Sequence, residues 1–316
     1  MSPVSTKIFF DECYGKYAIA AVNVFNMEQV HALFAAAQQA DAPIIVQITP
    51  ASRNYAHAHM LLAMVNTAST IYPGVLYAVH LDHGNEEHAF PAIEEGFTSV
   101  MIDASHDPFE KNVARTKAVV QKAHEKGISV EAELGVLSGV EDDLSIEDWK
   151  AKYTDPAQAR EFVELTGCDS LAIAVGTSHG AYKFSGGKGL QFDVLEKIQE
   201  GLPGFPLVLH GASLVNKEEV ERINRHGGLL QQDAAGVTKE ELSRAIQSGV
   251  CKVNIATDLR LLWARVYREF FTVHPDQFDP VVPGKLYMKA CMEMLSERFT
   301  LLGAAGKALT FKEITV

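Results

Sequence analysis

Eight short runs rich in β-branched and other apolar residues recur along the chain, and helix-forming stretches separate them. The runs are 18–23, 44–49, 76–80, 99–103, 128–133, 170–175, 207–210 and 250–255. Apolar residues at helical spacing indicate helices at 27–39, 108–126, 216–224, 239–247, 259–271 and 286–302. Strands that alternate with helices predict parallel strands joined by crossover helices, in either a closed (β/α)8 barrel or an open doubly wound sheet.

Nearly every run ends on a polar side chain that is able to bind or react. These side chains are Asn23, Thr49, Asp82 with His83, Asp103, Glu133, Ser178 with His179, His210 and Asn254. In a barrel the carboxyl ends of all eight strands converge on one face, where active sites lie, whereas the edge strands of an open sheet have little reason to carry such groups. We therefore expect an α/β fold, a (β/α)8 TIM barrel with extra C-terminal helices, as a single domain over residues 1–316.

Composition limits the classes of function. The chain has 316 residues, of which 47 % are apolar, enough for one barrel with a large core. The formal net charge of −12 does not suit nucleic-acid binding, but it leaves room for a small phosphorylated ligand held by backbone N–H groups. A signal-peptide pattern, an apolar run of about 18 residues and paired cysteines are all absent from the sequence. We expect a cytoplasmic protein with reduced thiols and with no nucleic-acid or membrane partner.

Three histidines, His83, His179 and His210, end the third, sixth and seventh runs, and each precedes a glycine. Imidazole is the commonest neutral ligand for zinc, and three protein ligands with one open position are typical of a catalytic site. One histidine at a strand end is more commonly a hydrogen-bonded polar residue, but three at converging ends predict a metal site. Asp103 and Glu133 are candidates for partners of these ligands, alternate ligands, a second cation site, or hydrogen-bond acceptors at the barrel rim.

Two carboxylates are candidates for proton transfer. Asp82 directly precedes a proposed ligand, and although adjacent strand residues point to opposite faces, the turn at a strand end lets both reach the cavity. Glu141 lies in the acidic, glycine-containing segment 134–157, which we expect to form a loop over the carboxyl face, as does 181–189. A carboxylate on a closing loop suits a carbanion step that excludes water; the alternative is a solvated acidic loop.

Phosphate-binding signals follow the last two runs. His210-Gly211-Ala212-Ser213 follows the seventh run, and Asn254-Ile255-Ala256-Thr257 follows the eighth. In barrels these two loops frequently form a phosphate site from backbone N–H groups. Gly180 is a further candidate donor, and the alternative interpretation is a pair of ordinary tight turns.

These residues belong to a series of motifs that runs from about Asn23 to about Gly306. The motifs are Asn23-Val24-Phe25-Asn26-Met27-Glu28-Gln29, His80-Leu81-Asp82-His83-Gly84, Met101-Ile102-Asp103-Ala104-Ser105, Glu131-Ala132-Glu133-Leu134-Gly135, Gly176-Thr177-Ser178-His179-Gly180, His210-Gly211-Ala212-Ser213, Lys252-Val253-Asn254-Ile255 and Asp258-Leu259-Arg260. The series resembles the class II, metal-dependent fructose-1,6-bisphosphate aldolases, and is most similar to the branch with His-Gly-Ala-Ser after strand seven.

The resemblance implies a glycolytic lyase that reversibly cleaves fructose-1,6-bisphosphate to dihydroxyacetone phosphate and glyceraldehyde 3-phosphate. Asp82 would move the proton of the C4 hydroxyl, Glu141 would take the C1 proton of dihydroxyacetone phosphate, and Asn254 would hydrogen-bond the enediolate. The catalytic Zn²⁺ would be held by His83, His179 and His210.

The same resemblance implies the remaining contacts. The 1-phosphate would be bound by Gly180, Gly211, Ser213 and Thr257, and the substrate site would also include Asn23, Thr49, Ala212, Ile255 and Ala256. Asp103 and Glu133 match positions that hold a second or displaced divalent metal. A monovalent cation, Na⁺ or K⁺, is typical of the family near Ser178, Gly180 and Gly211. Arg260 matches an arginine that reaches the distal phosphate, often in a neighbouring subunit, which implies a homodimer or homotetramer.

Three departures concern the distal half of the substrate. Thr49 stands where serine is common, Ala256 stands where many fructose-bisphosphate enzymes have aspartate, and Val281 replaces an expected arginine. Since tagatose-1,6-bisphosphate enzymes can carry alanine at the second position, tagatose-1,6-bisphosphate or another ketose 1-phosphate is the alternative substrate. A metal-dependent isomerase or hydrolase and a non-catalytic sugar-phosphate binding protein are further alternatives. Asn254 and Glu141 argue against the isomerase or hydrolase, and the complete set of ligands and acids argues against the binding protein.

Overall fold

The structure is a computed structural model that describes residues 2–136, 138–141, 144–146, 152–179, 189–231 and 236–311. Within these ranges the side chains of 138–141, 144–146 and 179 are not described.

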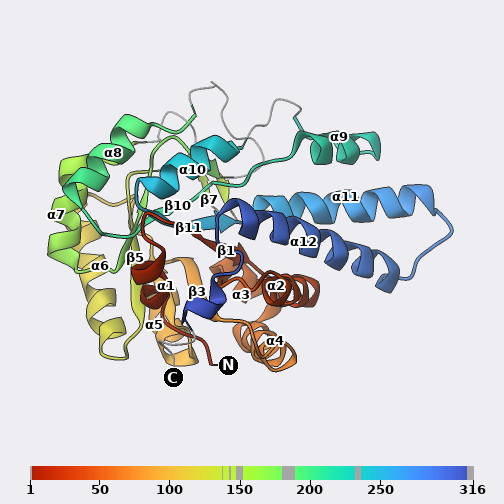
Figure 1. The fold of residues 1–316 in the computed structure, drawn as a ribbon, viewed down its shortest axis with the longest axis horizontal. Coiled ribbons are helices and arrows are strands. Elements are labelled where there is room, and N and C mark those ends of the chain that lie inside the picture. The colour runs from red at the N-terminus through yellow and green to blue at the C-terminus, as the bar shows by residue number, and fades with distance from the viewer. Residues whose placement is uncertain are drawn as a thin grey trace.

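Eight parallel strands close into a barrel in the order β1-β11-β10-β8-β5-β4-β3-β2 (Figure 1). Their bounds are β1 (Ile19–Asn23), β2 (Ile44–Ile48), β3 (Tyr77–Gly84), β4 (Ser99–Ile102), β5 (Ser129–Leu134), β8 (Ser170–Ile173), β10 (Leu207–Leu209) and β11 (Val250–Ile255). Each predicted run forms one of these strands, so the predicted barrel is confirmed. The first and last strands pair with each other, Ile19 opposite Lys252, and this closure excludes the open doubly wound sheet.

Helices cover the outside of the barrel. They are α1 (Thr6–Cys13), α2 (Met27–Ala40), α3 (Pro50–Ala56), α4 (Ala58–Ile71), α5 (Glu86–Glu95), α6 (Phe109–His124), α7 (Pro156–Thr166), α8 (Phe192–Gly201), α9 (Lys217–Arg225), α10 (Lys239–Gln247), α11 (Thr257–Val273), α12 (Val281–Leu301) and the 3₁₀ helix η2 (Ala308–Phe311). The six helices predicted from spacing are confirmed within a few residues at each end. None of these helices is long and apolar enough to cross a membrane, among the residues that the structure describes.

Local sequence signals fix several helix ends. Asn26 caps α2 by accepting a hydrogen bond from the backbone N–H of Gln29. Asp155 caps α7 in the same way, Pro156 occupies its first turn, and Gly167 ends it in the left-handed conformation. Such caps satisfy backbone groups that a helix end leaves without partners, and each typically contributes about 1 kcal/mol.

Two apolar layers hold the barrel together. Alternate strand residues, such as Val79 and Leu81, point outward and pack against the surrounding helices in one continuous core. The amino end of the barrel is closed by α1, whose Phe9 packs edge-on against Phe311 at a ring distance of 5.5 Å. Because apolar side chains close the amino end of the barrel, its carboxyl end is the one available to ligands.

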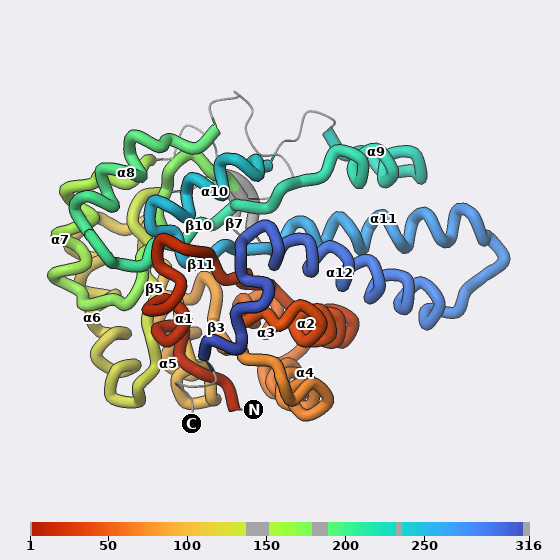
Figure 2. The backbone as a smooth tube through the Cα atoms, viewed as in Figure 1, coloured from red at the N-terminus to blue at the C-terminus, as the bar shows by residue number. Residues whose placement is uncertain are grey.

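The last two long helices extend beyond the barrel. Figures 1 and 2 show α11 and α12 running side by side away from it, joined at their far end by residues 274–280. α12 also packs against α2, and near the start of α12 the Tyr287 hydroxyl accepts a hydrogen bond from Gln29 Nε2 at 3.0 Å. We call α11, α12 and their connection the arm.

The segment after β5 differs from the expected plain loop. Its residues form β6 (Ser138–Glu141) and β7 (Leu144–Ile146), an antiparallel pair, and β6 also pairs in parallel with β9 (Ser178–His179). The expected loop over 134–157 thus contains a β-hairpin at these residues, which the sequence did not indicate. The second predicted loop, 181–189, lies outside the described residues except for Gly189.

Candidate active site

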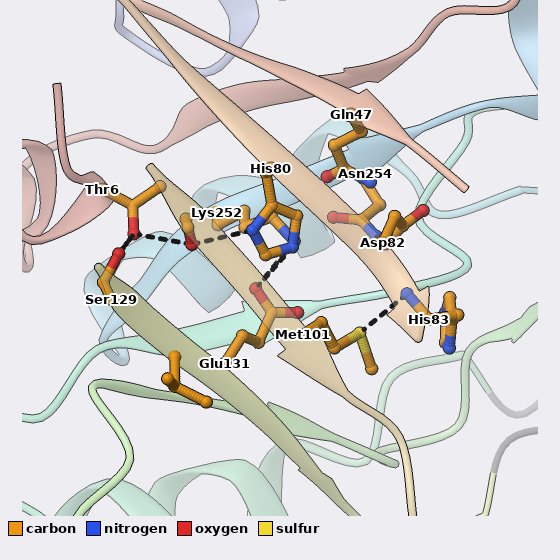
Figure 3. Close-up of polar contacts among 12 residues, drawn as sticks. Thr6, Gln47, His80, Asp82, His83, Met101, Ser129, Glu131, Lys252 and Asn254 are labelled. Carbon is orange, nitrogen blue, oxygen red and sulfur yellow. Dashed lines mark hydrogen bonds and ion pairs between the residues drawn. The ribbon is translucent and has the colours of Figure 1, made fainter. Parts of the chain in front are cut away.

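Polar side chains fill the carboxyl half of the barrel interior, where barrels usually carry bulky apolar residues. They alternate with outward apolar residues along the strands, as His80 and Asp82 do on β3. Across the interior Asp82 accepts a hydrogen bond from Asn254, and Lys252 lies within hydrogen-bond distance of both His80 and Glu131 (Figure 3). All five of these side chains are buried. Because buried polar groups need partners, this interior is one connected network.

Asp82 and His83 both face the cavity although they are neighbours on one strand. The pairing of β3 with β4 shifts register between Leu81 and Gly84, and His83 has a φ of 50°. A register irregularity of this kind re-aims side chains, and the left-handed conformation costs a non-glycine residue about 1–3 kcal/mol. Gly84 permits it, since a Cβ there would lie 2.6 Å from the Leu81 side chain and 3.2 Å from the Met101 carbonyl oxygen.

Two imidazoles meet at this point, each held by a carboxylate. His83 Nδ1 lies 2.9 Å from Asp103 Oδ2, and His210 Nε2 lies 2.8 Å from Glu131 Oε1. An ionised carboxylate only accepts hydrogen bonds, so each ring carries its proton on the nitrogen facing its carboxylate. The other two nitrogens, His83 Nε2 and His210 Nδ1, then direct lone pairs at each other across 2.7 Å. Two such lone pairs repel each other unless a proton or a metal ion lies close to both, and carboxylate-oriented histidines are the usual ligands of a divalent metal.

The charges around the two rings agree with this assignment. Burial opposes ionisation of Asp103, but hydrogen bonds from His83 and Ser105 outweigh it and hold the pKa of Asp103 below its usual range. Burial likewise opposes ionisation of Glu131, and the Lys252 ammonium together with His210 lowers its pKa. Burial, and next the neighbouring His83, lowers the pKa of His210. The carboxylates are therefore charged and the His210 ring is neutral at pH 7, as metal ligation requires.

Asp82 is fully buried and held by two amides. Asn23 Nδ2 donates to Asp82 Oδ2 at 2.7 Å, and Asn254 Nδ2 donates to Oδ1 at 3.2 Å. Gln47 donates to Asn23 Oδ1 at 3.2 Å, which fixes the direction of that amide. The Oδ1 of Asn254 is buried and has no hydrogen-bond partner among the described residues, so it can accept from a ligand hydroxyl. A carboxylate oxygen of Asp82 and one ring nitrogen from each of His83 and His210 all lie within 4.8 Å of one another, close enough to share one ion.

The remaining predicted metal-site residue is also within reach. Glu133 Oε2 lies 3.8 Å from His83 Nδ1, and His83, Asp103 and Glu133 form a second cluster able to hold a metal ion. Asp103 and Glu133 therefore both lie beside His83, one of the three predicted ligands.

The loops after β10 and β11 contain most of the predicted phosphate residues. Gly211 has a φ of 60°, and a Cβ there would lie 2.5 Å from the Ser178 carbonyl oxygen, so only glycine fits. Ala212 and Ser213 are buried beside it. After Ile255, the N-cap of α11 is Ala256, whose methyl side chain cannot accept a hydrogen bond from the first N–H groups of that helix. Uncapped N–H groups at a helix start attract anions, and Thr257 is the first helical residue here.

Asp258 joins these two loops. Its carboxylate accepts the backbone N–H groups of Leu214 at 3.3 Å and Val215 at 3.1 Å, and it pairs with the guanidinium of Arg298 at 3.3 Å. Val215 has a φ of 46°, an unusual conformation for a β-branched residue. The loop after β10 is therefore held in a strained shape by the first turn of α11.

Three residues that the sequence linked to the substrate occupy positions that do not by themselves show a contact with it. The Thr49 hydroxyl caps α3 by accepting from the backbone N–H of Ser52, so it is already engaged. Arg260 is exposed on α11. Val281 is exposed and is the first residue of α12. Figure 2 shows that α12 starts at the end of the arm that lies away from the barrel.

Three further predictions fall outside what the structure describes. The side chains of Glu141 and His179, and the whole of Gly180, lie outside the described residues. The backbone of these segments is informative, because Gly139 of β6 is paired with His179 of β9. This pairing brings the strand that ends on Glu141 beside the strand that ends on His179.

Sequence reasoning assigned no role to the deepest polar residues, Glu131, Lys252, Gln47 and Ser99. Their signal is the alternation of polar and apolar residues in strands that are buried on both faces, as in Ser129 to Glu133. Such alternation normally indicates a solvent-exposed face, and here it indicates a polar barrel interior.

The comparisons with known proteins agree with this geometry. The family model described as fructose-bisphosphate aldolase class-II matches residues 4–307. The chain is 42 % identical to a fructose-bisphosphate aldolase of Giardia intestinalis, over 95 % of this chain and 93 % of that protein. It is also 42 % identical to a fructose-bisphosphate aldolase of Thermus caldophilus, over 92 % of this chain and 95 % of that protein. The crystal structure of the YdjI aldolase of Escherichia coli K12 superposes with a TM-score of 0.77 at 30 % identity, covering 97 % of this chain and 99 % of that one.

Proposed function

This chain belongs to the class II fructose-bisphosphate aldolase family, and on that premise we propose a zinc-dependent reaction carried out by the residues converging at the carboxyl end of its barrel. The chain is an aldolase, a carbon–carbon lyase that reversibly cleaves fructose-1,6-bisphosphate to dihydroxyacetone phosphate and glyceraldehyde 3-phosphate. Membership also implies a divalent metal and a phosphorylated sugar substrate. The reaction belongs to glycolysis, and a cytoplasmic location is part of the proposal.

One observation carries the proposal: His83 Nε2 and His210 Nδ1 direct their lone pairs at one point beside Asp82. We propose that His179 supplies the third zinc ligand, with Asp103 and Glu133 available for a second divalent ion. When bound by these residues, zinc would supply Lewis-acid stabilisation of negative charge on the substrate oxygens.

The proton transfers are assigned to side chains of this chain. Asp82 accepts the proton of the C4 hydroxyl in cleavage and returns it in condensation, while Asn23 and Asn254 keep its carboxylate aimed at the cavity. Asn254 also hydrogen-bonds the enediolate. Glu141 carries the C1 proton of dihydroxyacetone phosphate. A base within hydrogen-bond reach of the proton it moves is the geometric requirement for this role.

The loops after β8, β10 and β11 are proposed to bind the 1-phosphate. The contacts would come from Gly180, Gly211, Ser213 and Thr257, and Ala212 and Ile255 would line the substrate site beside them. The close approach of Gly211 to Ser178 and the uncapped start of α11 support this assignment. A monovalent cation, Na⁺ or K⁺, is proposed near Ser178, whose buried hydroxyl has no partner among the described residues.

The distal half of the proposed substrate site offers few polar or positively charged side chains to bind a second phosphate. Thr49 and Arg260 are assigned to it, but the hydroxyl of Thr49 caps a helix, Ala256 offers no polar group, and Val281 lies at the end of the arm. These features favour tagatose-1,6-bisphosphate or another ketose 1-phosphate as the second candidate substrate.

The arm supports a homodimer or homotetramer. Large apolar residues gather on it in exposed positions, among them Trp263, Phe271, Val273, Phe278 and Leu286, and Phe278 is 89 % exposed. Exposed apolar patches of this kind mark protein interfaces. We propose that copies of this chain, each one domain over residues 1–316, associate through the arm, and that the far end of the arm, with Val281, approaches a neighbouring site.

A coupled cleavage assay tests the proposal. Fructose-1,6-bisphosphate, tagatose-1,6-bisphosphate and fructose 1-phosphate are compared before and after treatment with a chelator, and then with Zn²⁺ restored. We expect cleavage that the chelator abolishes and zinc restores, with the fructose bisphosphate as the best substrate. Cleavage that survives metal removal would refute the metal-dependent mechanism, and a preference for the monophosphate would replace the first substrate with the second.

A further inference from the structure

Beneath the proposed metal site lies a buried chain of polar side chains to which the proposed reaction gives no role. Lys252 Nζ lies 2.8 Å from Glu131 Oε2 and 3.4 Å from His80 Nε2, and His80 Nδ1 lies 2.8 Å from Ser99 Oγ (Figure 3). All of these side chains are between 0 and 1 % exposed. Lys252 therefore lies below the cavity and contacts none of the proposed metal ligands directly.

The polarity of this chain follows from the lysine. An ammonium group only donates, so Glu131 Oε2 and His80 Nε2 are both acceptors. The proton of His80 must then be on Nδ1, where it donates to Ser99 Oγ at 2.8 Å. Ser99 Oγ in turn accepts from Thr6 of α1 at 3.3 Å, at the closed end of the barrel. The lysine and the serine thus fix the direction of every hydrogen bond between them.

The same lysine determines which oxygen of Glu131 faces the metal site. With Oε2 held by Lys252, the other oxygen, Oε1, is aimed at His210 Nε2 at 2.8 Å. His210 must then carry its proton on Nε2 and present the lone pair of Nδ1 to the cavity. We propose that Lys252 is a positioning residue for the metal, which orients Glu131 and thereby fixes the ring and tautomer of His210 for ligation. This inference rests on the proposed metal site.

An ordinary stabilising ion pair is a weaker explanation of Lys252. Buried ion pairs contribute little net stability, because the cost of removing both charges from water offsets their attraction, and apolar side chains of equal volume often serve as well. Geometry distinguishes the two roles: only one Glu131 oxygen binds the lysine, and the second spans to a proposed ligand. A purely stabilising pair has no reason to leave one carboxylate oxygen directed at a histidine that faces a cavity.

The test compares four variants of the full chain: Lys252→Met, Glu131→Gln, the double Glu131→Gln/Lys252→Met, and His83→Ala as the reference for loss of a ligand. Arg53→Met is the matched control, since it removes a partly buried ion pair, with Glu95, outside the barrel. The zinc dissociation constant of the metal-free protein is measured by competition with a chromophoric chelator. Thermal midpoints and the separate values of kcat and KM, at low and at saturating zinc, complete the set.

We expect Lys252→Met to weaken zinc binding by about 10–100-fold, the usual effect of removing a partner that orients a ligand. Glu131→Gln and the double variant should weaken it by the same factor, because all three act on one hydrogen bond. Saturating zinc should restore kcat with KM little changed, and Arg53→Met should lower only the thermal midpoint. The double variant leaves no uncompensated buried charge, so it keeps the test available if a single variant fails to fold.

Zinc affinity equal to that of the parent in Lys252→Met, or in the double variant, would overturn the proposal and leave Lys252 a structural residue. Effects of the two single changes that multiply in the double variant would also overturn it, because Lys252 would then act independently of Glu131. If His83→Ala retains full zinc affinity, the proposed metal site itself is wrong and this inference falls with it. Loss of affinity in His83→Ala without loss in Lys252→Met refutes the inference alone.

Discussion

Replacing Gly211 with alanine perturbs the loop after β10 at its contact with the strand end that carries Ser178. The new Cβ would lie 2.5 Å from the Ser178 carbonyl oxygen and 2.8 Å from its carbonyl carbon, and both are backbone atoms that a rotamer change cannot move. The φ of 60° adds about 1–2 kcal/mol for any residue with a Cβ. We expect Gly211→Ala to lower the free energy of unfolding by about 2–3 kcal/mol, the conformational cost plus part of the clash.

The consequence for the melting temperature follows from the size of the chain. An unfolding entropy of about 2 cal/mol/K per residue over 316 residues makes each kcal/mol worth about 1.5 °C, so the midpoint should fall by about 3–5 °C. Since the loop is proposed to hold the 1-phosphate with backbone N–H groups, its displacement should raise KM by about tenfold, or 1.4 kcal/mol, with a smaller effect on kcat. Calorimetry and steady-state kinetics measure both quantities. An unchanged midpoint would refute the steric argument, and an unchanged KM would remove Gly211 from the phosphate site.

Two further predictions concern the same end of the barrel. Asp258→Asn gives the N–H groups of Leu214 and Val215, and the guanidinium of Arg298, a neutral amide oxygen in place of a carboxylate. We expect the free energy of unfolding to fall by about 1–3 kcal/mol and the KM to rise. Equal KM values in the variant and the parent would contradict the bracing role of Asp258. The second concerns pH. Burial, and next Lys252, holds the pKa of His80 well below its ordinary value, and burial lowers that of His210. Below about pH 6.5 the unfolded chain therefore binds protons at these histidines, whereas the folded chain does not. The metal-free protein should lose stability as the pH falls from 7 to 5. Denaturant titrations that show a flat or rising free energy of unfolding over this range would contradict the buried neutral state.

The sequence was sufficient for the barrel because each strand is a short run bounded by turns, and because strand position carries meaning in a closed barrel. A polar residue at the carboxyl end of a parallel barrel strand must lie at the carboxyl face of the barrel. This is why His83, His210, Asp103 and Glu133 were predicted to meet, and they do.

The polar interior beneath the site was not predictable in the same way. Glu131 and Lys252 sit on different strands, far apart in sequence, and only the register of the closed barrel brings them to 2.8 Å. The register shift before Gly84 is also invisible in the sequence, since it depends on the fit of β3 against β4. Glycines in 135–139 indicated an open loop, yet Gly139 pairs with Ile146 in a hairpin, because strand pairing outweighed the weak preference of glycine against strands.

The most direct measurement is the anomalous diffraction of crystals of the zinc-loaded protein, collected on both sides of the zinc absorption edge. We expect one strong peak at the carboxyl end of the barrel, within coordination distance of His83 Nε2, His210 Nδ1 and a third ligand from His179. A protein that cleaves fructose-1,6-bisphosphate with its zinc elsewhere, or with no peak between His83 and His210, would contradict the central claim that these converging lone pairs form the catalytic metal site.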